Sequence, residues 1–160
     1  MSNVIDQSGL LAISTRLQRL SDHLRKDGQK IYELYGVAFE PKWFPVIYTL
    51  HQKAVLSVVE IANEIGYTHP STISLLKELE KEKLIRSKRD KTDERKRLLT
   101  LTEKGKTLIE QMKPVWDTMI KSLVTLTNTS NNIMKAIEEV EAEMEKQSFY
   151  QRAQMIKRKE

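Results

Sequence analysis

Cysteine is absent from this 160-residue chain, and glycine and proline are scarce, at five and four residues. The lack of cysteine excludes disulfide bonds, zinc–thiolate sites and redox sensing by thiols. Hydrophobic residues make up 39% of the sequence and charged residues 31%. With so little glycine and proline, this composition favours a globular and mostly helical fold, and the length fits one domain.

Long hydrophobic runs are also missing. No stretch of about 18 apolar residues occurs, and no basic leader precedes an apolar segment at the start, MSNVIDQSGLL. The sequence therefore predicts a cytoplasmic protein that neither spans a membrane nor is secreted.

Sequence signatures of a metal or catalytic site are lacking as well. The histidines His23, His51 and His69 fall on three different expected elements, with no pair spaced by one helical turn. No Ser, His and Asp order, phosphate loop or glycine-rich fingerprint accompanies the carboxylates. We expect no metal, no cofactor and no enzymatic activity.

Positive charge is concentrated in one short segment. The formal net charge of the chain is +5, which is modest for a nucleic-acid-binding protein. Residues 86–97 hold seven Lys or Arg against three Asp or Glu, so this segment alone carries +4. The segment, more than the total charge, indicates a nucleic-acid contact.

The first expected helix has an apolar seam. Its residues alternate by threes and fours, as in packed helix pairs, with a single break at Asp27: Leu10, Ile13, Leu17, Leu20, Leu24, Ile31 and Leu34. The pattern favours packing against a second copy of the chain, whereas packing within the subunit is the alternative. Gly36 ends this helix.

Two short helices joined by a glycine turn are predicted in the middle of the chain. Ser57 and Glu60 form a capping box for a helix over 58–65, and Gly66 supplies its left-handed end. Thr68 caps the next helix, which has Pro70 in its first turn. The core face of that helix is expected to consist of Thr72, Leu75, Leu76 and Leu79. This arrangement is the helix-turn-helix pattern.

A charged β-hairpin and further helices follow. Two extended runs, 84–89 and 96–101, flank a polar segment over 90–95. Thr102 caps a long helix with its own apolar seam, which Pro114 is expected to kink: Leu108, Met112, Val115, Met119, Leu123 and Leu126. After a break near 128–132, a last helix begins around Ile133.

A helix-turn-helix followed by a basic hairpin fits duplex DNA. The second helix enters the major groove, while the hairpin reaches the backbone or the minor groove. Any solvated hairpin could be basic, but its position directly behind the two helices favours DNA. The residues of the second helix that face away from the core are candidate contacts to bases or phosphates: Pro70, Ser71, Ile73, Ser74 and Lys77.

The order of elements and the run DERKRLLTLTEKGK resemble the MarR family of winged-helix transcriptional regulators. The resemblance covers residues 10 to about 153, and FEPKWFPVIYTL and HPSTISLLKELEKEKLI are similar to a subgroup often fused to an acetyltransferase. It implies that Asp93 braces the wing and that Arg95 enters the minor groove. It adds Lys88, Arg89, Lys91, Lys96 and Arg97 as weaker candidates for phosphate contacts. The sequence departs from the family at Lys83, where relatives usually have glycine.

An aromatic group precedes the helix-turn-helix, comprising Trp43, Phe44, Tyr48 and His51. Core packing is the ordinary role of such a stripe. In similar regulators, ligands bind between the dimer helices and the DNA-binding lobe, and this implies a small-molecule effector near these four residues.

We therefore predict an α+β fold, mostly α, forming a single domain over residues 1–160. Residues 1–36 and 103–160 are expected to form the dimer helices, and 41–102 the winged helix-turn-helix lobe. The predicted function is transcriptional regulation, more often repression, by a homodimer on a roughly palindromic site in double-stranded DNA. The alternative is a winged-helix protein-interaction module without DNA binding.

Overall fold

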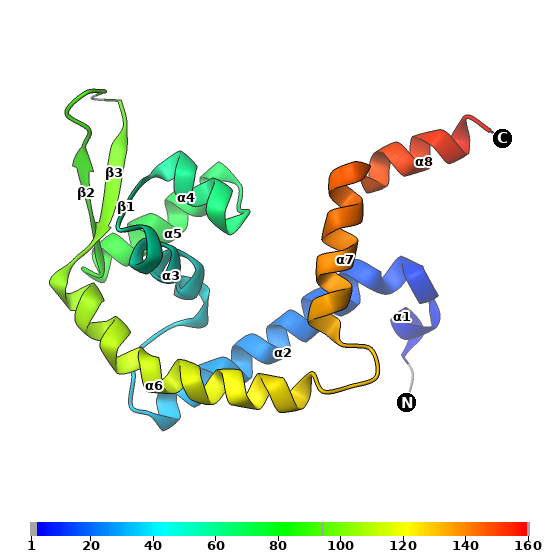
Figure 1. The fold of residues 1–160 in the computed structure, drawn as a ribbon, viewed down its shortest axis with the longest axis horizontal. Coiled ribbons are helices and arrows are strands. Elements are labelled where there is room, and N and C mark those ends of the chain that lie inside the picture. Colours follow the sequence, from blue (N-terminus) through cyan, green and yellow to red (C-terminus); the bar gives the residue numbers. More distant parts are fainter. Residues whose placement is uncertain (1–2, 94, 160) are drawn as a thin grey trace. The chain divides into compact units, whose positions relative to one another are not determined.

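The computed structural model describes residues 3–93 and 95–159. The short N-terminal elements and the first long helix are α1 (Val4–Gln7), η1 (Gly9–Ala12) and α2 (Ile13–Leu34). The middle of the chain comprises η2 (Pro41–Trp43), α3 (Phe44–Lys53), β1 (Val55–Ser57), α4 (Val58–Ile65), α5 (His69–Lys81), β2 (Ile85–Arg89) and β3 (Arg97–Leu101). The last helices are α6 (Glu103–Leu126), α7 (Ile133–Lys146) and α8 (Phe149–Lys157) (Figure 1).

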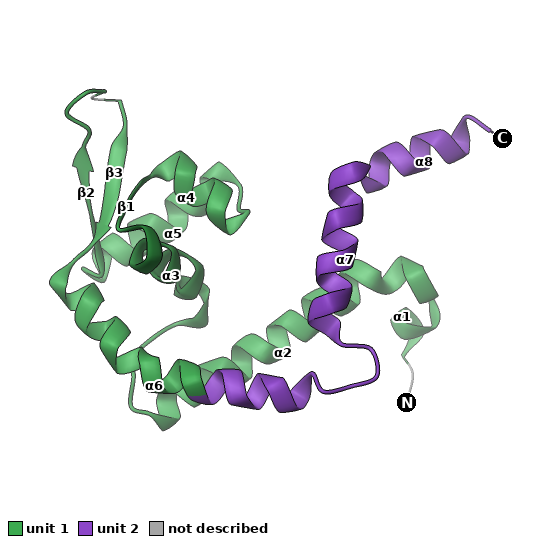
Figure 2. Ribbon diagram, in the orientation of Figure 1, with its two compact units in different colours: residues 1–117 green, residues 118–160 purple. Residues whose placement is uncertain are grey.

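The chain divides into two compact units, residues 1–117 and 118–160 (Figure 2). The first unit contains the elements from α1 to β3 and the beginning of α6. The second contains the end of α6 with α7 and α8. None of the helices in the described part of the chain combines the length and the hydrophobicity that crossing a membrane requires.

The sheet of the first unit has three antiparallel strands in the order β1-β3-β2. The hairpin predicted over 84–101 is present as β2 and β3, with Ile85 opposite Leu101 and Arg89 opposite Arg97. Sequence analysis did not predict β1, whose three residues pair with β3 so that Leu56 lies opposite Leu99. A strand this short carries too little alternation to be recognised in a sequence. The mostly helical α+β class is confirmed.

Side chains from α3, α4, α5, the sheet and α6 form one core. The expected inner face of α5 is confirmed, because Thr72, Leu75, Leu76 and Leu79 are all buried. Helix α3 divides the aromatic group from the core. Val46, Ile47 and Leu50 are buried there, while Phe44 and Tyr48 remain 39% and 42% exposed. A helix only ten residues long presents two apolar stripes, and its neighbours decide which one is buried.

Helix α6 runs without interruption through Pro114, and the expected kink stays a prediction. Its buried side is formed by Gly105, Ile109, Met112 and Val115. Of the predicted seam, Met112 and Val115 are buried, Leu108 is half-buried, and Leu123 and Leu126 are exposed in the single chain. In the second unit, Ser148 and Gln151 form a capping box that begins α8, a helix that sequence analysis did not separate from α7.

Lys83 occupies a left-handed position at the end of α5, with φ of +59°. The Leu84 amide donates to the Leu79 carbonyl at 3.0 Å, and the Lys83 amide donates to the Glu80 carbonyl at 2.9 Å. These two bonds define a Schellman motif, whose left-handed residue is usually glycine. The departure from the family at this position therefore keeps the turn but places a Cβ atom in a strained conformation.

Lys83→Gly is expected to stabilise the protein. Left-handed backbone costs an L residue roughly 1–2 kcal/mol, and the entropy that glycine adds to the unfolded chain offsets about half of this. We expect a net gain of about 0.5–1 kcal/mol and a melting temperature about 1–4 °C higher by thermal denaturation. Lys83→Ala, which removes the charge but keeps the Cβ atom, should show no such gain. Equal melting temperatures for the two variants would contradict the strain argument.

Candidate nucleic-acid interface

The predicted helix-turn-helix is built by two local capping motifs. In α4 the Ser57 amide donates to Glu60 Oε2 at 2.7 Å, and the Glu60 amide donates to Ser57 Oγ at 3.3 Å. Gly66 ends this helix with φ of +68° and ψ of +23°. The Thr68 hydroxyl then accepts from the Ser71 amide at 3.3 Å and begins α5. All of these predicted caps are confirmed.

The exposed side of α5 corresponds to the predicted contact face. Pro70, Ser71, Ser74 and Lys77 are exposed, and Ile73 is half-buried beside the core. The Ser71 Oγ accepts from the Thr68 hydroxyl at 2.9 Å, which leaves its own proton available to donate. Two hydroxyls, an ammonium group and an aliphatic edge can together meet base edges, phosphates and a thymine methyl.

Strands β2 and β3 form a wing, defined here as residues 85–101, that extends away from helices α4 and α5 (Figure 1). Two aspartates order its tip. Asp93 Oδ1 accepts from the Arg95 amide at 3.1 Å and from Arg95 Nε at 3.2 Å. The Arg95 side chain is nevertheless 91% exposed. Its backbone is thus fixed while its guanidinium group stays accessible, which suits the groove contact that the resemblance implies.

Asp90 is a second brace at the wing, and sequence analysis missed it. Its Oδ1 accepts from the Thr92 amide at 2.8 Å and from the Thr92 hydroxyl at 2.7 Å. These bonds, with the positive charge of Lys96, hold the pKa of Asp90 below its ordinary value, so the carboxylate stays ionised at neutral pH. The Asp-x-Thr spacing is the signal that could have revealed this turn.

The basic candidates on the wing divide into two groups. Lys88, Arg89, Lys91 and Lys96 are exposed on the same hairpin as Arg95. Arg97 differs, because its guanidinium group is bound within the protein. Its Nη2 lies 3.0 Å from both carboxylate oxygens of Glu80 on α5. Arg97 is thus paired with a carboxylate of the protein, although its side chain stays 48% exposed, and its phosphate contact stays a prediction.

The structure separates the four residues predicted for a ligand pocket. Trp43 is buried and packs edge-on against Phe39, with ring centroids 5.6 Å apart. Its indole nitrogen donates to Glu78 Oε1 at 2.7 Å. Phe44 and Tyr48 instead stack on each other at 5.2 Å, and His51 is exposed. Trp43 is therefore a core residue that contacts helix α5 and does not share the face of the other three.

Trp116 on α6 completes the aromatic face, and sequence analysis did not include it. Its ring lies 5.7 Å from those of both Phe44 and Tyr48, edge-on to each. The Trp116 indole nitrogen donates to the Tyr32 hydroxyl on α2 at 2.9 Å. Since Trp116 is 72 residues from Phe44 in sequence, only the tertiary structure could bring it into this cluster.

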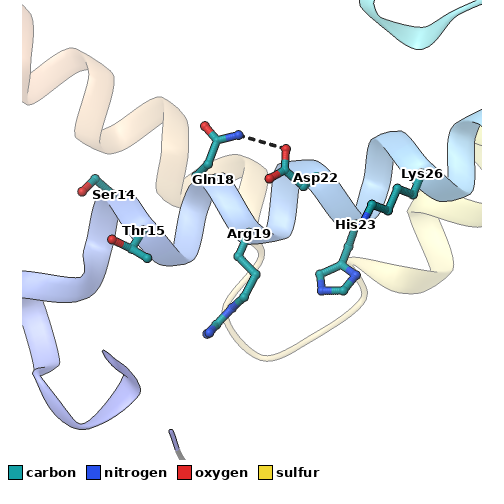
Figure 3. A pocket seen from close by; sticks show the side chains of 7 residues that line it. All are labelled: Ser14, Thr15, Gln18, Arg19, Asp22, His23 and Lys26. Atoms are coloured by element: carbon teal, nitrogen blue, oxygen red, sulfur yellow. Dashed lines mark hydrogen bonds between the residues drawn. The ribbon is translucent and has the colours of Figure 1, made fainter. Parts of the chain in front are cut away.

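An open groove of about 640 Å³ lies on the polar side of α2 and is lined by Ser14, Thr15, Gln18, Arg19, Asp22, His23 and Lys26 (Figure 3). Three of its side chains are already paired, because Gln18 donates to Asp22 at 2.9 Å and Arg19 binds Asp6. None of the aromatic residues predicted for the ligand pocket lines this groove. Among the residues that the structure describes, no three metal-ligating side chains gather.

Comparisons with known proteins identify a family model and solved structures that resemble this chain. Residues 44–112, from α3 into α6, match the family model of the transcriptional regulator SarA/Rot. Among curated proteins, no sequence matches the chain significantly. Solved structures of MarR-family regulators share the same arrangement of elements. The chain has the winged-helix fold of the MarR-family transcriptional regulators.

Three solved structures illustrate the likeness in fold. MepR of S. aureus, solved with DNA, is 23% identical with a TM-score of 0.65, over 82% of this chain and 94% of that one. MosR of M. tuberculosis, also solved with DNA, is 16% identical with a TM-score of 0.70, and the match covers 82% of this chain and 95% of MosR. BpsR of Bordetella bronchiseptica is 21% identical with a TM-score of 0.58, and the match covers 81% of this chain and 98% of BpsR. DNA binding by BpsR is regulated by 6-hydroxynicotinic acid.

Proposed function

We propose that this chain is a transcriptional regulator, and more specifically a repressor, that binds a roughly palindromic site in duplex DNA as a homodimer. The observation that carries the proposal is the pairing of an exposed polar face on α5 with a wing that holds Arg95 out in solvent. The match of residues 44–112 to a family of transcriptional regulators supports it, as do the DNA complexes of MepR and MosR. Binding of duplex DNA implies action in the cytoplasm and needs no catalytic group.

Dimerisation is supported by apolar surface on α2. Leu17, Leu20 and Leu24 are 48%, 40% and 41% exposed, although they lie on one face of the helix. A soluble protein seldom leaves such a stripe in water. We propose that residues 1–36 and 103–160 form the dimer part, with residues 41–102 as the DNA-binding lobe. A two-fold axis would then place two recognition helices about 34 Å apart, one turn of DNA.

DNA binding is expected to depend on Arg95 and Lys77. Selection from a random duplex pool should return a preferred site, on which fluorescence anisotropy measures affinity. Each lost contact should cost about 1–3 kcal/mol, so Arg95→Ala with Lys77→Ala should weaken binding at least about a hundredfold. The slope of log affinity against log salt should also fall, by roughly 0.9 for each phosphate contact removed.

Lys113→Ala serves as the control for this experiment. It removes one exposed cation from α6, where Lys113 pairs with Glu110 at 2.6 Å, and should leave the affinity nearly unchanged. If the double variant bound the selected duplex as tightly as the parent, with the same salt slope, the DNA contacts would be wrongly assigned. The protein-interaction module would then be the better description.

We further propose that a small, partly apolar ligand binds at the aromatic face of Phe44, Tyr48, His51 and Trp116. Half-exposed stacked rings favour a flat aromatic ligand, and the regulation of BpsR by 6-hydroxynicotinic acid shows such control on this fold. A hundredfold preference of the ligand for the non-binding state would supply about 2.7 kcal/mol per site, enough to release DNA from a dimer.

A screen of small aromatic acids, beginning with 6-hydroxynicotinic acid, should find a compound that raises the melting temperature and lowers DNA affinity. Its binding should change the fluorescence of Trp116, which lies in the site, far more than that of the buried Trp43. Trp116→Phe is therefore expected to remove the fluorescence response, and Trp43→Phe to retain it. A compound whose response is lost in Trp43→Phe instead would bind elsewhere and contradict the assignment.

A further inference from the structure

Arg97 lies on the inner face of the wing. Side chains alternate along a strand, so Arg97 shares its face of β3 with Leu99 and Leu101. Leu99 is 0% exposed and Leu101 is 8% exposed, both within the core. Arg97 is the outermost residue of this buried row and is therefore directed toward the helices and away from a DNA backbone outside the wing.

Glu80, near the end of recognition helix α5, receives this guanidinium group. Arg97 Nη2 donates to Glu80 Oε1 and Oε2, each at 3.0 Å, and lies 2.7 Å from Ser87 Oγ on β2. The side chains of Arg97 and Glu80 are 48% and 25% exposed, so the pair is partly shielded from water. One arginine thus connects the recognition helix and both strands of the wing.

The carboxylate of Glu80 offsets the repulsion between Arg97 and a second arginine. Arg89 lies directly opposite Arg97 in the ladder, and like charges in such a pair destabilise a sheet. Glu80 neutralises Arg97, while Arg89 stays exposed for other contacts. Without Glu80, the outer end of the strand ladder would hold two facing cations.

We propose that Glu80 and Arg97 form a bridge that fixes the wing relative to the recognition helix, which makes Arg97 a positioning residue and not a phosphate contact. Its effect on affinity rests on the proposed DNA binding. A helix in the major groove and a wing in the adjacent groove must fit the same duplex at the same time. A wing that moves freely must become ordered when DNA binds, and the entropy lost in this step reduces the binding free energy.

The direction in which Glu80→Gln changes the DNA affinity distinguishes a phosphate contact by Arg97 from a positioning role. Glu80→Gln removes a negative charge and releases Arg97. If Arg97 binds phosphate, Glu80→Gln should tighten DNA binding and steepen the salt slope. If the bridge positions the wing, it should weaken binding of the selected duplex by about tenfold in the dimer, as should Arg97→Gln. The double variant should be no weaker than either single variant, because each removes the same bridge.

Two controls accompany these variants. Glu82→Gln makes the same change in charge at the end of α5, and the Glu82 carboxylate forms no ion pair among the described residues, so binding should tighten slightly or stay equal. Lys88→Gln, which removes an exposed cation from the face of the wing opposite to Arg97, should lower the salt slope by roughly 2 for the two copies in the dimer. Arg97→Gln should leave the slope unchanged.

Hydrogen exchange of the free protein tests the bridge without DNA. Amides of β2 and β3 should exchange about two- to fivefold faster in Glu80→Gln and Arg97→Gln, and no faster in the double variant, while those of α3 stay unchanged. Unchanged exchange in the wing, or tighter DNA binding by Glu80→Gln, would overturn the proposal. If the parent protein bound no duplex, the proposed function would fail, and hydrogen exchange alone would decide whether the bridge exists.

Discussion

Gly105→Ala is expected to lower the free energy of unfolding by about 3 kcal/mol, at the upper end of the usual cost of overpacking a core. A Cβ atom at Gly105 would lie 2.2 Å from the Leu84 carbonyl oxygen and 3.3 Å from Leu101 Cδ2. The oxygen cannot move away easily, because it also accepts from the Thr102 amide at 3.0 Å and from the Thr102 hydroxyl at 3.1 Å.

The effect should appear as a fall in melting temperature of roughly 6–12 °C in thermal denaturation. Alanine has the higher helix propensity by about 1 kcal/mol, so the propensity acts against the expected change. Lys106→Ala, one residue further along α6 and exposed, should leave the melting temperature within about 2 °C. A Gly105→Ala variant as stable as the parent would show that the wing base and α6 can move apart freely, contrary to this close packing.

Leu17→Glu is expected to weaken dimerisation by at least about a hundredfold, and DNA binding with it. The substitution would place a carboxylate from each copy in an apolar interface, where burying an unpaired charge costs several kcal/mol. Leu17 is 48% exposed in the single chain, so the folding of the subunit should change little. Sedimentation at micromolar concentration should show a dimer for the parent and a monomer for the variant.

Thr15→Glu is the matched control, because Thr15 lies on the opposite side of the same helix, in the groove of Figure 3. A carboxylate in the first turn of α2 is also favoured by the helix dipole. This variant should remain dimeric. A parent protein that sediments as a monomer, or a Leu17→Glu variant that remains a dimer, would remove the leucine seam from the proposed interface.

Much of the lobe was predictable because its signals are local. Ser57, Gly66 and Thr68 act through bonds to residues two to four positions away, so their spacing determines the ends of α4 and α5. Asp93 also acts locally, on Arg95 two residues away, but its role as a brace was implied by the resemblance to the MarR family. Alternation and capping depend only on residues that are close in the sequence, so both can be recognised without the structure.

The sequence by itself determined the helix-turn-helix, the basic hairpin, the buried face of α5 and the resemblance to MarR-family regulators. Only the tertiary structure decided that Trp43 belongs to the core, that Trp116 joins Phe44 and Tyr48, and that Arg97 binds Glu80. The residues of these pairs are separated by 17 to 72 positions in the sequence. Such contacts follow from how the elements pack together, and no local pattern records that packing.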